Sequence, residues 1–391
     1  MTHEHLRDLL DDLVADVTPI DRLDQAWEAA RTRRRRRTAG VVGGAALAVV
    51  TVIGLTQLGD GDPSTPSPAP TGPSSPSVSP SPSAAPIGVA GPRYRGAETW
   101  WIPGSAAEAG LPWLDGTGLP RSIDVSAGAP SAAGIGRAVA VLATWPDSPT
   151  SRVVAVALDG SSHAVDISRL EPVADEPGNT ISALVSESLS PDGRHAFFVQ
   201  ERSLEVYDFG TGDWIGIATP DYLAEGARWL TSTEIWVPER LGDTGTGTSY
   251  DLDGGTPRVS LVRWVGGDWI GDEEYGPVVA TSSDTAQAIF LADYATGPDG
   301  VGFGGLNGVA ATRDGVPSLL VMGPHDERWK GCCPVVGFAD ESTVLFESRH
   351  AEARVLAWEV GTGRLEQVAR IVGWQPGQES YVASWRLPLG G

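Results

Sequence analysis

The stretch that decides the fold reads SESLSPDGRHAFFVQERSLEVYDFGTGDW and covers residues 186–214. It contains two apolar and aromatic runs, 196–200 and 204–209, separated by three polar residues and flanked by turn signals. The first signal is Ser190-Pro191-Asp192-Gly193. In such a turn proline presets φ, the aspartate side chain can bond the backbone, and glycine tolerates a positive φ. The segment therefore predicts a turn followed by two neighbouring strands.

The same pattern continues over residues 94–391, where short apolar runs alternate with turns rich in Gly, Asp, Ser and Pro. Residues 207–214 are echoed by 358–365, and residues 228–237 are echoed by 337–346 without gaps. Apolar strands start near residues 139, 196, 235, 288 and 344. Irregular spacing of about 50 residues with four strands per unit is typical of a β-propeller. We expect an all-β domain of six or seven blades, with a strand at 381–385 completing the first blade.

The Ser190–Arg194 motif followed by an apolar strand resembles the repeats of TolB-like and WD40-like propellers. The whole chain resembles a family of actinobacterial membrane-anchored proteins with such propellers, because an arginine block, an apolar segment and a Pro/Ser spacer come first. This resemblance implies a fold and no activity, since propellers host many unrelated functions.

Residues 39–58 (AGVVGGAALAVVTVIGLTQL) form a run of 20 residues without a charge, long enough at 1.5 Å per residue to cross a bilayer as a helix. Five arginines precede it, and Asp60 and Asp62 follow it. Positive charge at the N-terminal flank predicts an uncleaved signal anchor with the N-terminus in the cytoplasm and the C-terminal domain outside. A cleaved signal, a twin-arginine signal and a buried core helix fit less well. The topology determinants are Arg33, Arg34, Arg35, Arg36 and Arg37.

Residues 1–38 predict a short helical arm on the cytoplasmic side. Leucines and valines recur at helical spacing with aspartates between them, which indicates an amphipathic helix. Its apolar stripe is a candidate surface for a cytoplasmic regulatory partner, or a stub that lies near the membrane. The arm resembles the N-terminal regions of actinobacterial membrane-anchored anti-sigma factors, but it has no cysteine for their zinc motif. The stripe consists of Leu6, Leu9, Leu10, Leu13, Val14 and Val17.

Residues 59–93 separate the anchor from the β domain. Their ten prolines and many serines predict an extended spacer that reaches up to about 100 Å at roughly 3.1 Å per residue. The chain has 28 basic and 50 acidic residues, and the arm is neutral, so the formal charge of −22 falls on the part outside the membrane. An acidic domain repels phosphate backbones, which argues against nucleic-acid binding.

Few residues carry recognisable chemistry. The neighbours Cys332 and Cys333 either form a vicinal disulfide, or bridge to another chain through one thiol, or remain two small, partly buried apolar residues. The Gly300–Gly305 run lacks the βαβ setting of a dinucleotide site, and the acidic loop that starts at Asp251 lacks the later ligands of a calcium loop. A set of tryptophans could line a sugar-binding surface by stacking, although packing between blades explains them better: Trp100, Trp101, Trp113, Trp264 and Trp269. We therefore expect no catalytic, metal or cofactor-binding set.

Three functions remain in view. The first is a non-enzymatic binding or scaffold module at the cell envelope, whose partner is an envelope protein or a glycan. The second is a transmembrane sensor that relays binding to a partner of the cytoplasmic helix. The third is an envelope enzyme acting on glycan or peptide, against which stands the lack of a recognisable nucleophile and base.

Overall fold

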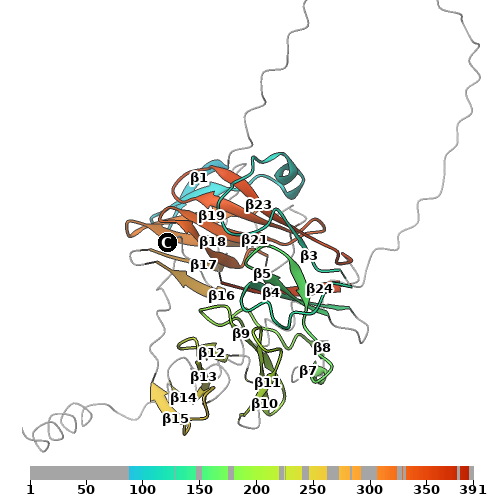
Figure 1. Cartoon of the computed structure of the whole chain (residues 1–391). Helices are drawn as coiled ribbons and strands as arrows, with labels where there is room; N and C mark the ends of the chain where they lie inside the picture. Colours follow the sequence, from blue (N-terminus) through green and yellow to red (C-terminus); the bar gives the residue numbers. More distant parts are fainter. Residues whose placement is uncertain are drawn as a thin grey trace, which may run out of the picture. The chain divides into compact units, whose positions relative to one another are not determined.

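The computed structural model describes residues 88–386 with internal gaps (Figure 1). The gaps are 127, 147–151, 175–179, 220–223, 225, 240–245, 262–272, 282–283, 292–305, 324–327, 329–331 and 377–378. The described residues belong to one compact unit, Ser81–Gly391. The predicted arm, arginine block and anchor lie outside them. None of the helices within the described ranges is long and apolar enough to cross a bilayer.

The stretch 186–214 forms the expected turn and hairpin. After the turn, β9 (His195–Val199) pairs antiparallel with β10 (Ser203–Asp208), which pairs with β11 (Trp214–Ala218). In the turn, Ser190 Oγ donates to Asp192 Oδ1 at 2.8 Å, and Gly193 adopts φ 72°. A Cβ on Gly193 would lie 2.3 Å from the carbonyl oxygen of Ala138. The turn therefore needs glycine both for its backbone conformation and for its close approach to the neighbouring sheet.

Three further antiparallel sheets follow β9–β11 along the chain, and consecutive strands are neighbours within each. The first comprises β12 (Arg228–Trp229), β13 (Glu234–Pro238), β14 (Thr246–Asp251) and β15 (Arg258–Leu261). The second comprises β16 (Glu273–Ala280), β17 (Thr285–Leu291), β18 (Leu306–Arg313) and β19 (Val316–Val321). The third comprises β20 (Val335–Asp340), β21 (Thr343–Ser348), β22 (Arg354–Glu359) and β23 (Leu365–Val372).

The C-terminal strand joins the first sheet of the series. This sheet has the order β24 (Glu379–Trp385), β4 (Ala138–Pro146), β5 (Arg152–Ala157) and β6 (Ser162–Ala164). Strand β24 pairs antiparallel with β4 over its whole length. The prediction that the strand at 381–385 completes the first unit is confirmed. Such pairing ties the two ends of the domain together and covers a sheet edge.

The segment before β4 adds strands to the outer edges of the last two sheets. Strand β2 (Ala97–Trp101) pairs parallel with β19, and β1 (Val89–Tyr94) pairs with β2. Strand β3 (Ser122–Asp124) pairs parallel with β23. A short 3₁₀ helix, η1 (Ser105–Gly110), lies between β2 and β3 in the chain. A small ribbon of β7 (Val173–Ala174) and β8 (Thr180–Ile181) precedes β9.

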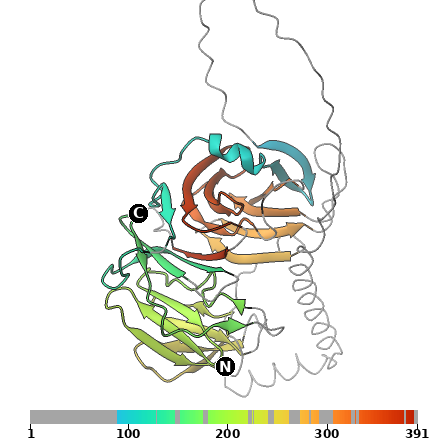
Figure 2. The ribbon, with the colours of Figure 1, turned by 90° about the vertical axis from the view of Figure 1, so that its right-hand side faces the viewer.

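Hydrophobic clusters pack neighbouring sheets face to face. In β9, Phe197 belongs to the cluster shared with the β12–β15 sheet, and Phe198 belongs to the cluster shared with the β4–β6 sheet. Similar clusters join the β4–β6 sheet to β20–β23, and β20–β23 to β16–β19. Figure 2 shows the orange strands of β16–β19 beside the red strands of β20–β23. Because inner sheets bury both faces, their strands read as continuous apolar runs.

The fold is all-β, as predicted, and is consistent with a β-propeller-like arrangement of sheets. Among the described residues there are five sheets of three or more strands and one two-stranded ribbon. The expected six or seven blades stay a prediction.

Candidate functional site: a buried carboxylate cluster and its neighbouring pocket

Of the site residues predicted from the sequence, the structure describes only the cysteine pair. The arginine block and the Leu6–Val17 stripe lie outside the described residues. Cys332 and Cys333 are joined by a disulfide just before β20. Both are fully buried in the cluster between the β16–β19 and β20–β23 sheets. The pair therefore lies in the core, in contact with apolar residues, and offers no exposed thiol.

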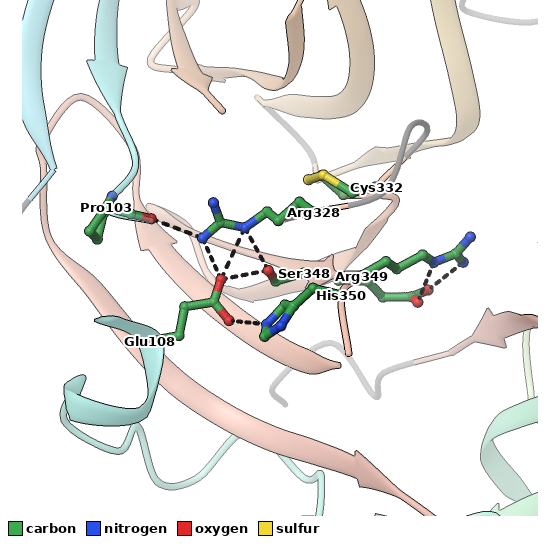
Figure 3. The surroundings of a disulfide bond; sticks show 9 residues. Pro103, Glu108, Arg328, Cys332, Ser348, Arg349 and His350 are labelled. Carbon is green, nitrogen blue, oxygen red and sulfur yellow. Dashed lines mark hydrogen bonds and ion pairs between the residues drawn. A yellow bond between two sulfur atoms is a disulfide. The ribbon is translucent and has the colours of Figure 1, made fainter. Parts of the chain in front are cut away.

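A cluster of charged side chains surrounds the carboxylate of Glu108, on η1, near this disulfide (Figure 3). Arg328 donates to Oε1 through Nε at 3.0 Å and also through Nη2. Ser348 Oγ donates to the same oxygen at 2.5 Å. The other oxygen, Oε2, lies 2.8 Å from His350 Nε2 and 3.6 Å from Arg354 Nη1. We call these five residues the Glu108 cluster.

The cluster comes from segments far apart in the sequence. Glu108 and Arg328 are separated by 220 residues. Ser348 ends β21, and Arg354 begins β22, so the β21–β22 turn supplies one side of the cluster. A further guanidinium hydrogen bond, from Arg328 Nη2 to the carbonyl oxygen of Pro103 at 2.9 Å, fixes the chain just before η1. The interactions therefore bind the η1 segment to the β20–β23 sheet.

The electrostatics of the cluster favour a charged carboxylate. Burial by itself would raise the pKa of Glu108, but the hydrogen bond from His350, the charge of Arg328 and the Ser348 hydroxyl together lower it. Burial lowers the pKa of Arg328, and the charge of Glu108 opposes that effect. Two guanidiniums and two further partners therefore satisfy the buried carboxylate of Glu108.

The arrangement differs from that of a nucleophile and its base. Ser348 and His350 both bind the same carboxylate, whereas a nucleophilic serine needs a hydrogen bond to its base and access to substrate. Ser348 and Glu108 are fully buried. The Glu108 cluster is therefore arranged to stabilise a buried charged carboxylate and to fix the η1 segment on the β20–β23 sheet.

A second buried ion pair fixes the C-terminal strand. Glu347, on β21, accepts two bonds from Arg349, at 2.9 and 3.2 Å. It also accepts the indole N–H of Trp385 on β24, at 2.8 Å. Burial, followed by the charge of Glu347, raises the pKa of the neighbouring Tyr381 well above its usual value. The hydrogen bond from Trp385 to Glu347 joins β24 to β21 across two sheets.

A pocket of about 320 Å³ opens beside the Glu108 cluster. Its walls are the residues 351–354, at the start of β22, and the residues 370–374 with Pro376, at the end of β23. We call it the Arg354 pocket, because Arg354 belongs both to its lining and to the Glu108 cluster. Its volume falls at the lower end of the range for small-molecule sites, roughly 300–1,000 Å³.

The described residues meet few of the requirements of a metal site or of a sugar-stacking surface. Within the described ranges no three His, Cys, Asp or Glu side chains are grouped closely enough to hold a metal ion. Trp101 is buried, while Trp113 is half-buried and has the guanidiniums of Arg121 and Arg370 near its ring, at 5.2 and 5.9 Å. The described tryptophans therefore include one surface ring that stacks with cations from this same chain.

Sequence reasoning missed both the Glu108 cluster and the pocket. Glu108 stands alone between alanines in SAAEAG, a segment without periodicity. The one usable signal was Arg349-His350 in a β-hairpin turn with Glu352 and Arg354, which concentrates charge in five or six residues. That signal does not reveal the distant partners Glu108 and Arg328.

The packed sheets and the paired C-terminal strand define an all-β fold that is consistent with a propeller-like arrangement. No protein-family model and no curated protein matches the chain. Among solved structures it is similar to the AtxE2 isopeptidase, with a TM-score of 0.32 and 13% identity over 61% of this chain and 48% of that one. It is also similar to a putative TolB from Agrobacterium tumefaciens, with a TM-score of 0.28 and 13% identity over 64% of this chain and 99% of that one. For TolB from Acinetobacter baumannii the TM-score is 0.25, at 13% identity over 60% and 66% of the two chains. The chain spans about half the length of the isopeptidase.

Proposed function

We propose that this protein is a binding module, held at the cell envelope by the segment 39–58, whose β domain recognises its partner without catalysing a reaction. The observation that carries the proposal is the Arg354 pocket, an open site built from the turn before β22 and the segment after β23. Strand ends and turns on a packed set of sheets are where such scaffolds place recognition residues.

Two features support a binding role over an enzymatic one. The described side chains that most resemble catalytic groups, Glu108, Ser348 and His350, bind one another inside the protein. Their bonds fix the elements that frame the pocket, because Arg354 connects the cluster to the pocket wall. The pocket is therefore prearranged for binding, which lowers the ordering cost of association.

The membrane tether rests on the uncharged run, the five arginines before it and the spacer at 59–93. Attachment through an extended spacer lets a domain search for a partner that is fixed in the envelope. The N-terminal stripe supports a second candidate, a sensor whose cytoplasmic helix contacts a regulatory protein.

The test compares two forms of the full-length chain in membranes, the native form and one in which residues 2–30 are replaced by a neutral spacer. After chemical crosslinking, a binding module yields the same envelope partners from both forms. Loss of a cytoplasmic partner from the spacer form would establish the sensor instead.

External protease provides the topology control. Cleavage within 59–87, before strand β1 begins at Val89, should release the β domain while an epitope on the arm stays protected. Release without protease, or protection of the β domain in intact cells, would disprove the proposed tether.

A further inference from the structure

The lining of the Arg354 pocket has an excess of positive charge on a strongly acidic chain. Two guanidiniums, of Arg354 and Arg370, and one carboxylate, of Glu352, belong to the described lining. The chain as a whole has a formal charge of −22. A cationic pocket on an acidic protein concentrates an anion at that one place.

Arg354 is a buried donor that is only partly satisfied. Its side chain is 4% exposed, and Nη2 donates to the Glu352 carboxylate at 2.6 Å. Nη1 donates to the carbonyl oxygen of Glu352 at 3.1 Å. Among the described residues, Nε has no hydrogen-bond partner. Because Nε has almost no accessible surface, Arg354 contributes its positive charge to the pocket wall rather than a hydrogen bond through Nε.

Arg370 contributes a charge that no described carboxylate neutralises. It is exposed at the end of β23, and its guanidinium lies over the ring of Trp113 at 5.9 Å. The contact with the ring holds the side chain from one side without cancelling its charge. Arg370 is thus available to pair with an anion.

The remaining wall is apolar. The rings of Trp374 and Tyr381 meet at 5.3 Å and 67°, which fixes the indole. Ile371, Val372 and Pro376 belong to the same wall. Such a surface suits a flat, apolar ligand body rather than a fully hydrated ion.

We infer that the Arg354 pocket binds a small organic carboxylate with an apolar body. This inference deepens the proposed binding function and rests on it. The net charge of the described lining, +1, matches a monoanion, whereas a phosphate dianion would leave one negative charge unpaired. The carboxylate pairs with the exposed guanidinium of Arg370, the charge of Arg354 lies in the wall behind it, and the ligand body lies against Trp374.

The test measures binding to purified full-length protein by isothermal titration calorimetry with benzoate, the neutral isostere benzamide and inorganic phosphate. Benzoate should bind at least tenfold more tightly than benzamide or phosphate. Arg370→Gln should weaken benzoate binding at least fivefold, and raising NaCl from 50 to 500 mM should weaken it too. The matched control, Arg364→Gln, removes an exposed arginine from the turn just before β23 and should leave binding unchanged.

Equal binding of benzamide and benzoate, stronger binding of phosphate, or no binding of any probe up to 20 mM would overturn the inference. So would an Arg370→Gln protein that keeps its circular dichroism spectrum and its full benzoate affinity. These failures are separable from failure of the proposed function. Envelope partners recovered by crosslinking without benzoate binding refute only the pocket chemistry, and benzoate binding without any partner refutes only the envelope role.

Discussion

Replacing Glu108 with glutamine removes one charge from the centre of the Glu108 cluster while keeping the size and shape of the side chain. Glutamine can still accept bonds from Ser348 and Arg328 through its amide oxygen. What it cannot do is balance the charge of Arg328, whose side chain is 1% exposed. The variant therefore isolates the cost of an uncompensated buried guanidinium.

The magnitude follows from burial. Removing one partner of a buried ion pair typically costs about 3–5 kcal/mol, because the remaining charge has lost its solvation and its counterion. With about 2.1 cal/mol/K of unfolding entropy per residue, a domain of roughly 300 residues loses about 1.6 °C of melting temperature per kcal/mol. Glu108→Gln should therefore lower the melting temperature by about 5–8 °C.

The assay is thermal unfolding of the purified full-length protein by circular dichroism at pH 7. The matched control is Glu98→Gln, which breaks the pair between Arg93 and Glu98 at 2.9 Å, where the side chains are 68% and 45% exposed. Exposed pairs contribute about 0–1 kcal/mol, so the control should shift the melting temperature by less than about 2 °C. If Glu108→Gln lowered the melting temperature by as little as the control does, the view that the cluster stabilises the fold would be refuted.

Three further predictions concern pH, backbone and sulfur. Because the pKa of Glu108 is lowered in the folded state, its contribution to stability is present above the pKa of the unfolded chain and is lost as the pH falls through the folded value. The stability difference between wild type and Glu108→Gln, followed by urea denaturation, should persist from pH 7 to about 5 and shrink below about pH 4. Gly193→Ala combines a positive φ with a contact at 2.3 Å to the Ala138 carbonyl oxygen, so it should lower the free energy of unfolding by more than about 2 kcal/mol. Gly254→Ala, with φ 86° and open space around it, should lower it by about 1 kcal/mol. Equal losses of unfolding free energy for the two variants in urea denaturation would contradict the close contact at Gly193. Denaturing alkylation without reductant should add no label to Cys332–Cys333 by intact mass, and two labels after reduction; two labels without reductant would mean free thiols.

The hairpin and its turn follow from local chemistry. Ser190-Pro191-Asp192-Gly193 contains the residues that its turn requires, and the strand after it is apolar on both faces. The turn, the two strands of the hairpin and the all-β class could therefore be predicted from the sequence. The pairing of the last strand with an early one was also predicted, because a ring of blades is closed by a terminal strand that completes the first blade, and β24 does pair with β4.

The partners of the buried charged side chains could not be predicted from the sequence. Glu108 and Arg328 meet only after β2, η1 and β21 have been assembled, across 220 residues of chain. No spacing rule applies at such a distance, because the contact depends on how two sheets and a 3₁₀ turn pack rather than on a local period. The Arg354 pocket is hidden from the sequence for the same reason.

The sequence by itself determined the alternation of strands and turns, the uncharged run with its arginine flank, and the acidic balance of the chain, since each depends on residues close together. Only the tertiary structure decided which face of each strand meets which sheet, as with Phe197 and Phe198 on opposite sides of β9. It also decided that a lone glutamate becomes the centre of an ion network. The physical reason is that burial and charge pairing are set by neighbours in space, and the chain brings those neighbours from distant positions.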